Sequence, residues 1–113
     1  MVERYKASLD GVFGAIADPT RRAILQQLGR NPARVTDIAK GFPVSLNAVS
    51  KHLIVLQRAG LVRREVHGRD HICSLEGKPL REASAWIDGM RVFWEERLDA
   101  LERHIADKRR KKR

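Results

Sequence analysis

Residues 43–62 constrain the fold of this chain more than any other segment. The apolar residues of the segment recur at intervals of four and three, as they do on one face of a helix. They are Val49, Leu53 and Leu56. Ser45 precedes this face, where its hydroxyl can accept a hydrogen bond from a first-turn amide, and Gly60 suits the left-handed conformation that ends a helix. The segment therefore predicts a capped amphipathic helix with one buried stripe.

Polar residues flank the buried stripe near the start of this helix. Asn47, Ser50 and Lys51 offer short hydrogen-bonding side chains and one cation, which suit base edges and phosphates in a major groove. We expect this surface to bind double-stranded DNA. His52 lies beside it, and the sequence leaves two roles open for this side chain: contact with DNA, or packing at the edge of the helix.

The charge balance also favours a polyanionic partner. The 113 residues include 23 Lys and Arg against 14 Asp and Glu, a formal net charge of +9. Six positive charges lie in residues 108–113, which we expect to be a disordered basic tail, either solvated, bound loosely to DNA or a remnant of cloning. Residues 1–107 are expected to form a single domain, with only a mild positive charge.

The composition also bears on the location of the protein. A single Cys excludes an internal disulfide and suits a reducing compartment. No apolar run approaches the length of a membrane span, and residues 2–5 lack the apolar core of a secretory signal. We therefore expect a cytoplasmic protein that has no membrane partner.

Three helices are predicted before residue 43. The first covers residues 4–16, with apolar residues at helical spacing. These are Leu9, Val12, Phe13 and Ile16. Asp18 and Pro19 begin the second helix as cap and first residue, and it extends to Gly29. Thr36 is expected to cap a short third helix. The short join between this helix and the next is the helix-turn-helix arrangement.

After Gly60 the pattern changes from helical periodicity to alternation. Residues 61–67 and 71–75 flank a glycine turn and predict a β-hairpin, the wing of a winged helix. Its cations can lie along a phosphate backbone or in a minor groove. They are Arg63, Arg64, His67 and Arg69.

A long helix is predicted from Pro79 to about Ile105. Its apolar residues alternate at threes and fours and include Met90, Trp94, Leu98, Leu101 and Ile105. One small subunit cannot cover this seam, and exposed apolar stripes of such length mark interfaces. We therefore expect a homodimer. Trp86, Phe93 and Trp94 fit either this seam or a small-molecule pocket, and the seam is favoured.

Three segments together resemble the ArsR-type winged helix-turn-helix repressors of bacteria: residues 18–28 (DPTRRAILQQL), 44–53 (VSLNAVSKHL) and 56–62 (LQRAGLV). The resemblance covers roughly residues 8–105. It implies a mostly α fold with a small β-hairpin, dimerising through the first and last helices, which adds Leu9 and Phe13 to the interface. It also implies that two copies of the predicted reading helix enter successive major grooves of an imperfect palindrome. The family's base-reading positions correspond to Asn47, Ser50 and Lys51, with Ser45 and His52 beside them.

The chain departs from the metal-sensing members of that family. Its third helix lacks their paired cysteines, and its last helix offers His104 as the only His. His67, His71 and Cys73 lie near one another in the hairpin, but a mobile loop without a nearby carboxylate makes a weak site. We expect no metal and no cofactor, and Cys73 is expected to be a buried residue of the second strand.

Other classes of function are less compatible with the sequence. An enzyme needs a nucleophile with a base, an acid–base pair or a held metal, and no such motif is found. The alternatives are a dimeric protein-interaction module and a repressor of the same fold released by a metal or small ligand. Arg21 and Arg22 oppose the dipole of their helix, so each needs either a phosphate or a carboxylate such as Asp18 or Asp10. No effector is identified by the sequence.

Overall fold

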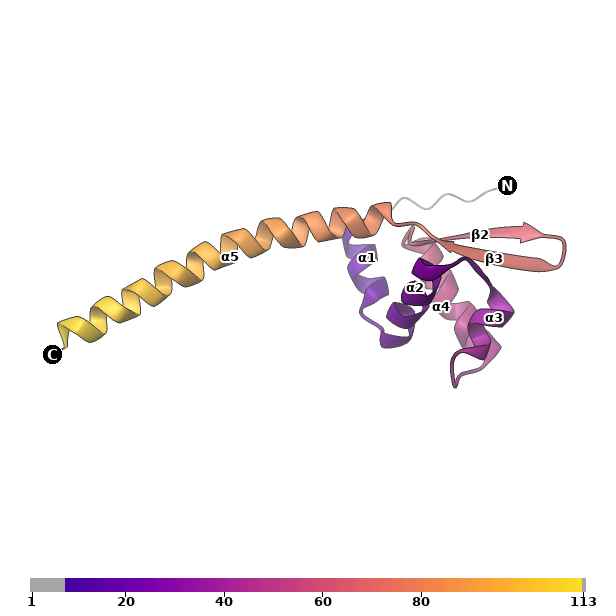
Figure 1. The fold of residues 1–113 in the computed structure, drawn as a ribbon, viewed down its shortest axis with the longest axis horizontal. Helices are drawn as coiled ribbons and strands as arrows, with labels where there is room; N and C mark the ends of the chain where they lie inside the picture. The colour runs from indigo at the N-terminus through magenta and orange to yellow at the C-terminus, as the bar shows by residue number, and fades with distance from the viewer. Residues whose placement is uncertain (1–7, 113) are drawn as a thin grey trace. The chain divides into compact units, whose positions relative to one another are not determined.

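The computed structural model describes residues 8–112 of the chain (Figure 1). The elements follow in the order α1 (Leu9–Ile16), α2 (Pro19–Arg30), β1 (Ala33–Arg34), α3 (Val35–Lys40), α4 (Leu46–Arg58), β2 (Val62–His67), β3 (Asp70–Leu75) and α5 (Lys78–Lys111). The fold is therefore mostly helical with a small antiparallel sheet, as the sequence predicts. The chain divides after Ala83 into two compact units, each described here by itself.

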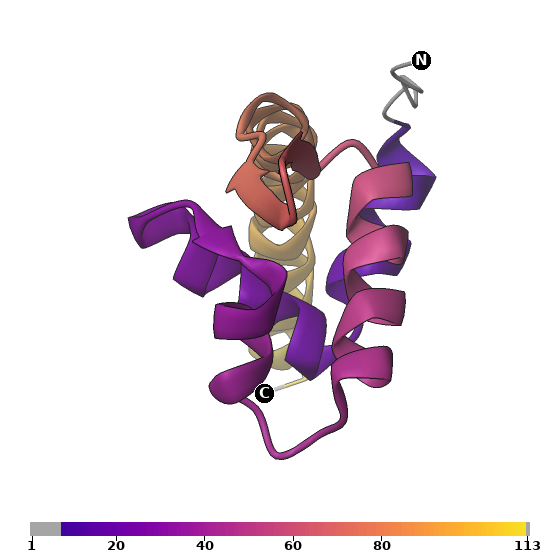
Figure 2. The ribbon, with the colours of Figure 1, turned by 90° about the vertical axis from the view of Figure 1, so that its right-hand side faces the viewer.

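The first unit has one core, to which its helices and sheet each contribute. The side chains that are completely or almost completely buried include Val12, Ile24, Ile38, Val49, Leu53, Leu56, Leu61 and Cys73. Figure 2 shows α4 at the right of this unit, the connection from α3 to α4 at the bottom and the hairpin at the top. The apolar stripe predicted for α4 is confirmed, because all three of its residues lie in this core.

Local signals set most of the helix boundaries. Asp18 accepts a hydrogen bond from the Arg21 amide at 3.0 Å, and Ser45 accepts one from the Ala48 amide at 3.1 Å, as predicted. Gly60 and Gly68 have φ values of +78° and +63°, which only glycine adopts without strain, and they end α4 and turn the hairpin. Of the first predicted helix, residues 4–7 lie outside the described part.

The start of α3 differs from the prediction. Arg34, not Thr36, is the residue that precedes the helix, and its side chain makes no capping hydrogen bond. The reason is β1, which the sequence did not predict: Ala33 and Arg34 pair with Cys73 and Ile72 of β3. The strand leads directly into the helix, so Thr36 already lies in the first turn.

The sheet has the strand order β1-β3-β2, with antiparallel pairing throughout. Arg64 lies opposite Cys73 and Arg63 lies opposite Ser74. Residues opposite one another share a face of the sheet, whereas neighbours along a strand alternate. Arg63 and Arg64 therefore belong to different faces of the hairpin, a distinction on which the site depends.

Helix α5 continues past its predicted end. It reaches Lys111 rather than Ile105, so residues 108–111 are helical where the sequence favoured a disordered tail. The reason is composition, since Ala, Lys and Arg are good helix formers and no proline or glycine follows Gly89. Pro79 and Ala83 at its start are buried, and Ala83 belongs to the core of the first unit. None of the described helices is long and apolar enough to cross a membrane.

Candidate nucleic-acid interface

The predicted reading residues lie together at the start of α4. Asn47 and Lys51 are exposed and Ser50 is half-buried, while Val49 and Leu53 between them are buried. Burial of these two residues fixes the rotation of the helix, and the Ser45 cap fixes where it begins. Leu46 is also exposed at this end. It was not predicted as a site residue, although an exposed leucine can contact the methyl group of thymine.

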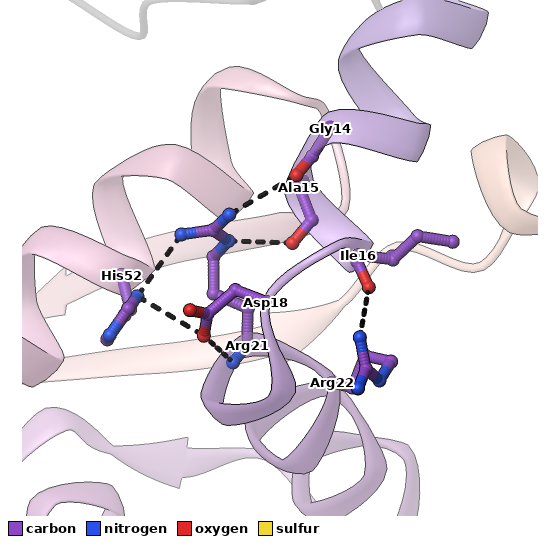
Figure 3. A network of polar contacts seen from close by, with 7 residues as sticks. All are labelled: Gly14, Ala15, Ile16, Asp18, Arg21, Arg22 and His52. Atoms are coloured by element: carbon purple, nitrogen blue, oxygen red, sulfur yellow. Dashed lines mark hydrogen bonds and ion pairs between the residues drawn. The ribbon is translucent and has the colours of Figure 1, made fainter.

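His52 faces the interior of the chain. Its side chain is 23% exposed, and its Nδ1 lies 3.3 Å from Nη1 of Arg21 and 3.9 Å from the Asp18 carboxylate. Figure 3 shows the imidazole, the carboxylate and the guanidinium converging between α2 and α4. Of the two roles left open by the sequence, the structure shows packing and an intramolecular contact, while contact with DNA stays a prediction.

The two arginines at the start of α2 hold the end of α1. Nε of Arg21 donates to the Ala15 carbonyl at 2.6 Å and its Nη2 donates to the Gly14 carbonyl at 3.2 Å. Nη1 of Arg22 donates to the Ile16 carbonyl at 2.9 Å (Figure 3). The sequence left a phosphate and a carboxylate open as partners for these cations. The structure shows them bound to carbonyls in the last turn of α1, where positive charge is favourable.

Asp18 joins this network to the cap of α2. The hydrogen bond from the Arg21 amide holds the pKa of the Asp18 carboxyl below its ordinary value; desolvation opposes this shift, and the nearby His52 and Arg21 side chains add smaller lowering effects. The carboxylate thus stabilises the first turn of α2 while it lies near the ring of a residue in α4. Through His52, the middle of α4 is in this way connected to the start of α2 and, through Arg21, to the end of α1.

The outer face of the wing carries paired charges. Nε of Arg63 lies 3.4 Å from Glu65 and 3.5 Å from Glu76, and Nε2 of His67 lies 3.2 Å from Glu65. All of these side chains are at least two-fifths exposed, so the pairs are weak and a phosphate can compete for the cations. The structure therefore keeps Arg63 and His67 together, but apart from the other two wing cations.

Arg64 belongs to the inner face, beside the buried Cys73. Its Nε and Nη2 atoms are buried and have no hydrogen-bond partner among the described residues. Burial raises the pKa of the Cys73 thiol, and the positive charge of Arg64, together with the contact of its side chain with the thiol, partly opposes that shift. The sequence-based prediction placed Arg64 with Arg63. The alternation of strand residues was the signal that could have separated them.

Arg64, Arg69 and Ser50 line one hollow between the wing and the starts of α3 and α4. Its volume is about 290 Å³. Arg34 lines it too, and its guanidinium lies 3.0 Å from Asp37 and 3.7 Å from Asp70. The sequence analysis missed Arg34, because its position depends on the pairing of β1 with β3.

The second unit presents an exposed apolar row along α5. Trp94, Leu98 and Leu101 are 56%, 53% and 52% exposed, and Ile105 is also exposed, whereas Met90 is half-buried. The Phe93 and Trp94 rings pack edge to face with centroids 5.8 Å apart, and the Arg97 guanidinium lies 5.0 Å from the centre of the Phe93 ring. These aromatic residues are not among those that line the hollow between the wing and the starts of α3 and α4.

Comparison with known proteins identifies the family. A family model described as a helix-turn-helix domain matches residues 16–65, from the end of α1 into β2. The HTH-type transcriptional regulator Rv2034 of Mycobacterium tuberculosis is 38% identical over 87 residues, covering 77% of this chain and 78% of that protein. A solved ArsR family transcriptional regulator, RHA00566, is 40% identical with a TM-score of 0.73, covering 77% of this chain and 96% of that one. This chain belongs to the ArsR family.

A further relative supports the same assignment. The transcriptional repressor SdpR of Bacillus subtilis is 34% identical over 79 residues, covering 70% of this chain and 88% of that protein. As an ArsR family member, the chain is a transcriptional regulator with a DNA-binding winged helix-turn-helix, not an enzyme. Within residues 8–112, no group of three or more His, Cys, Asp and Glu side chains is arranged to hold a metal ion.

Proposed function

We propose that this ArsR family regulator is a homodimeric repressor that binds an imperfect palindrome in duplex DNA. The observation that carries the proposal is the start of α4, where Asn47 and Lys51 are exposed on a helix whose cap and buried face fix its orientation. An amide side chain pairs with adenine in the major groove, and a lysine pairs with guanine or a phosphate. Repression is supported by the similarity to SdpR, itself named a repressor.

The dimer is proposed from the apolar row of α5. Residues that follow one another at intervals of four and three form a continuous stripe on a helix. Four apolar residues of α5 have this spacing, and each is at least 43% exposed in the single chain: Trp94, Leu98, Leu101 and Ile105. Water contact along such a stripe is unfavourable, so a second copy of α5 is the natural cover. Leu9 and Phe13 of α1 are proposed to join this interface. A dimer presents two copies of α4, which is why the operator is expected to be palindromic.

We propose different roles for the α4 and wing residues. Asn47, Ser50 and Lys51 read bases, whereas Arg69 at the exposed tip contacts phosphate without regard to sequence. Arg63 and His67 contribute less, since a phosphate must compete with Glu65 for them. Residues 108–113 add nonspecific attraction to the DNA. A regulator that binds chromosomal DNA works in the cytoplasm, and we propose that location.

The proposal is tested with DNA fragments selected from the source genome by binding to the purified protein. Asn47→Ala is expected to relax base preference and weaken binding by about 1–3 kcal/mol, whereas Arg69→Ala is expected to weaken binding to all fragments and lower the salt slope by about one. Arg58→Ala, at the other end of the same helix, is the control for Lys51→Ala and is expected to change binding little. Equal losses on selected and random DNA for every variant contradict this division of roles.

A further inference from the structure

The hollow between the wing and the helix-turn-helix has the dimensions of a small ligand site. Its volume of about 290 Å³ lies just below the range of roughly 300–1,000 Å³ that is usual for pockets that bind organic molecules. Val35 and Leu46 supply apolar lining, and Thr36 and Ser50 supply hydroxyl groups. A molecule with a small apolar body and a polar group matches this mixture.

The charge of the lining favours an anion. Three arginines line the hollow, against one carboxylate, that of Asp70. Arg34 lies 3.7 Å from Asp70 and 3.0 Å from Asp37, so Asp70 already has a cation of the lining as its partner and the lining as a whole stays positive. Arg64 and Arg69 have no ion pair within the part of the chain that the structure describes, which leaves two positive charges facing the same space. His71 in the same lining adds a third when it is protonated.

Arg64 also has the geometry that an oxyanion requires. Its two buried atoms without a partner, Nε and Nη2, lie on one edge of the guanidinium, the edge that binds a carboxylate or phosphate through two parallel hydrogen bonds. Buried donors without acceptors are unfavourable. Arg64 also lines the hollow, but these two atoms are buried as they stand, so the site requires the side chain to turn toward the hollow for an oxyanion to satisfy both donors.

We propose that this hollow binds a small organic oxyanion, held by Arg64 with Arg69 beside it, and that its occupation controls DNA binding. The control of DNA binding rests on the proposed function, since Ser50 and Arg69 belong both to the hollow and to the proposed DNA surface. The same oxyanion chemistry is offered by a backbone phosphate of DNA and by a free small anion, and the experiments below distinguish these sources.

Binding is tested without DNA. The full chain, labelled with ¹⁵N, is titrated with benzoate and with inorganic phosphate at constant ionic strength. NMR follows the Nε–Hε signal of Arg64 in the wild type and, in every variant, the backbone amide signals of Thr36, Ser50 and Arg69, which line the same hollow. Saturable shifts are expected, with affinity falling about tenfold in Arg64→Gln and changing less than about twofold in Arg63→Gln. Arg63 is the matched control, because it is the next residue of β2 and lies on the opposite face.

Arg64→Lys provides a second variant, which keeps the positive charge beside Cys73 but removes the guanidinium edge that can make two parallel hydrogen bonds. It is also expected to bind about tenfold more weakly, and it replaces Arg64→Gln if that variant does not fold. Absence of saturation in the wild type, or equal weakening in the Arg63 and Arg64 variants, overturns the site. None of these measurements involves DNA, so their failure is distinct from a failure of the proposed function.

The two sources of the oxyanion are distinguished with a selected DNA fragment. Benzoate is expected to weaken DNA binding at least about fivefold in the wild type, with no effect in Arg64→Gln. If the fragment alone shifts the Arg64 signal as phosphate does, a DNA phosphate occupies the hollow. If it does not, the occupant is a free anion that acts as an effector. Binding of benzoate with unchanged affinity for the fragment contradicts control of DNA binding by this site.

Discussion

Residues 8–83 and residues 84–112 place their apolar side chains in opposite environments. In the first unit Ile24, Ile38 and Leu56 are fully buried, and the helix ends are joined by the Arg21 and Arg22 hydrogen bonds. In the second unit Leu98 and Leu101 remain about half exposed on a single helix. The apolar residues of the first unit therefore cover one another, whereas those of the second form the surface that we propose for the dimer.

The largest expected effect concerns the core of the first unit. Leu53→Ala removes a fully buried side chain beside the reading residues and is expected to lower the free energy of unfolding by about 2–5 kcal/mol. Leu98→Ala is expected to cost less than about 0.5 kcal/mol in dilute protein, with a loss that grows with protein concentration as the dimer forms. Chemical denaturation at several concentrations measures both. A loss of unfolding free energy for Leu98→Ala that is large and independent of protein concentration contradicts this difference between the two units.

The second prediction concerns acid, which should affect the network of the first unit. The pKa values of Asp18 and Asp37 are lowered in the folded chain, mainly by hydrogen bonds from the Arg21 amide and from the Arg34 side chain. A lowered folded-state pKa gives stability that is fully present above the ordinary value of 3.8 and is lost as pH falls through the folded value. Asp18→Asn and Asp37→Asn should each reduce the loss of stability in acid. Acid curves identical to the wild type in both variants contradict this account.

The smallest expected effect is that of metal ions. One Cys and four His are divided among α4, the wing and α5, and no described cluster suits a metal. Zinc, nickel or cadmium at one equivalent should therefore leave the affinity for a selected DNA fragment within about twofold, below the 1.4 kcal/mol of a tenfold regulatory effect. A tenfold loss that a chelator reverses would show that metals control this regulator.

The features predicted from sequence are those decided by neighbouring residues. The stripe of Val49 and Leu53, the Ser45 cap and the positive φ of Gly60 depend on helix periodicity and backbone sterics alone. The resemblance of three short segments then identified the family, which the comparisons confirm. The exposure of Asn47 and Lys51 on α4 followed from the same periodicity, while their role in reading bases stays a proposal.

The features missed from sequence depend on distant partners. β1 is two residues long and forms only by pairing with β3. Because of this pairing, α3 begins at Val35, earlier than predicted, and Arg34 lies beside Asp70. The carbonyl partners of Arg21 lie at the end of another helix, and carbonyls leave no signal in side-chain composition. The inward position of Arg64 follows from the register of β2 with β3, which fixes which residues share a face with Cys73.

The measurement that tests the contrast between the units most directly is the mass of the protein in solution. Light scattering at micromolar concentration is expected to show a dimer for the wild type and a monomer for the double substitution Leu98→Glu and Leu101→Glu, because charges placed in the apolar row must lose their hydration when it is covered. The far-ultraviolet spectrum should show that the first unit stays folded. A dimer that persists in the double variant contradicts the account and places the interface outside the apolar row of α5.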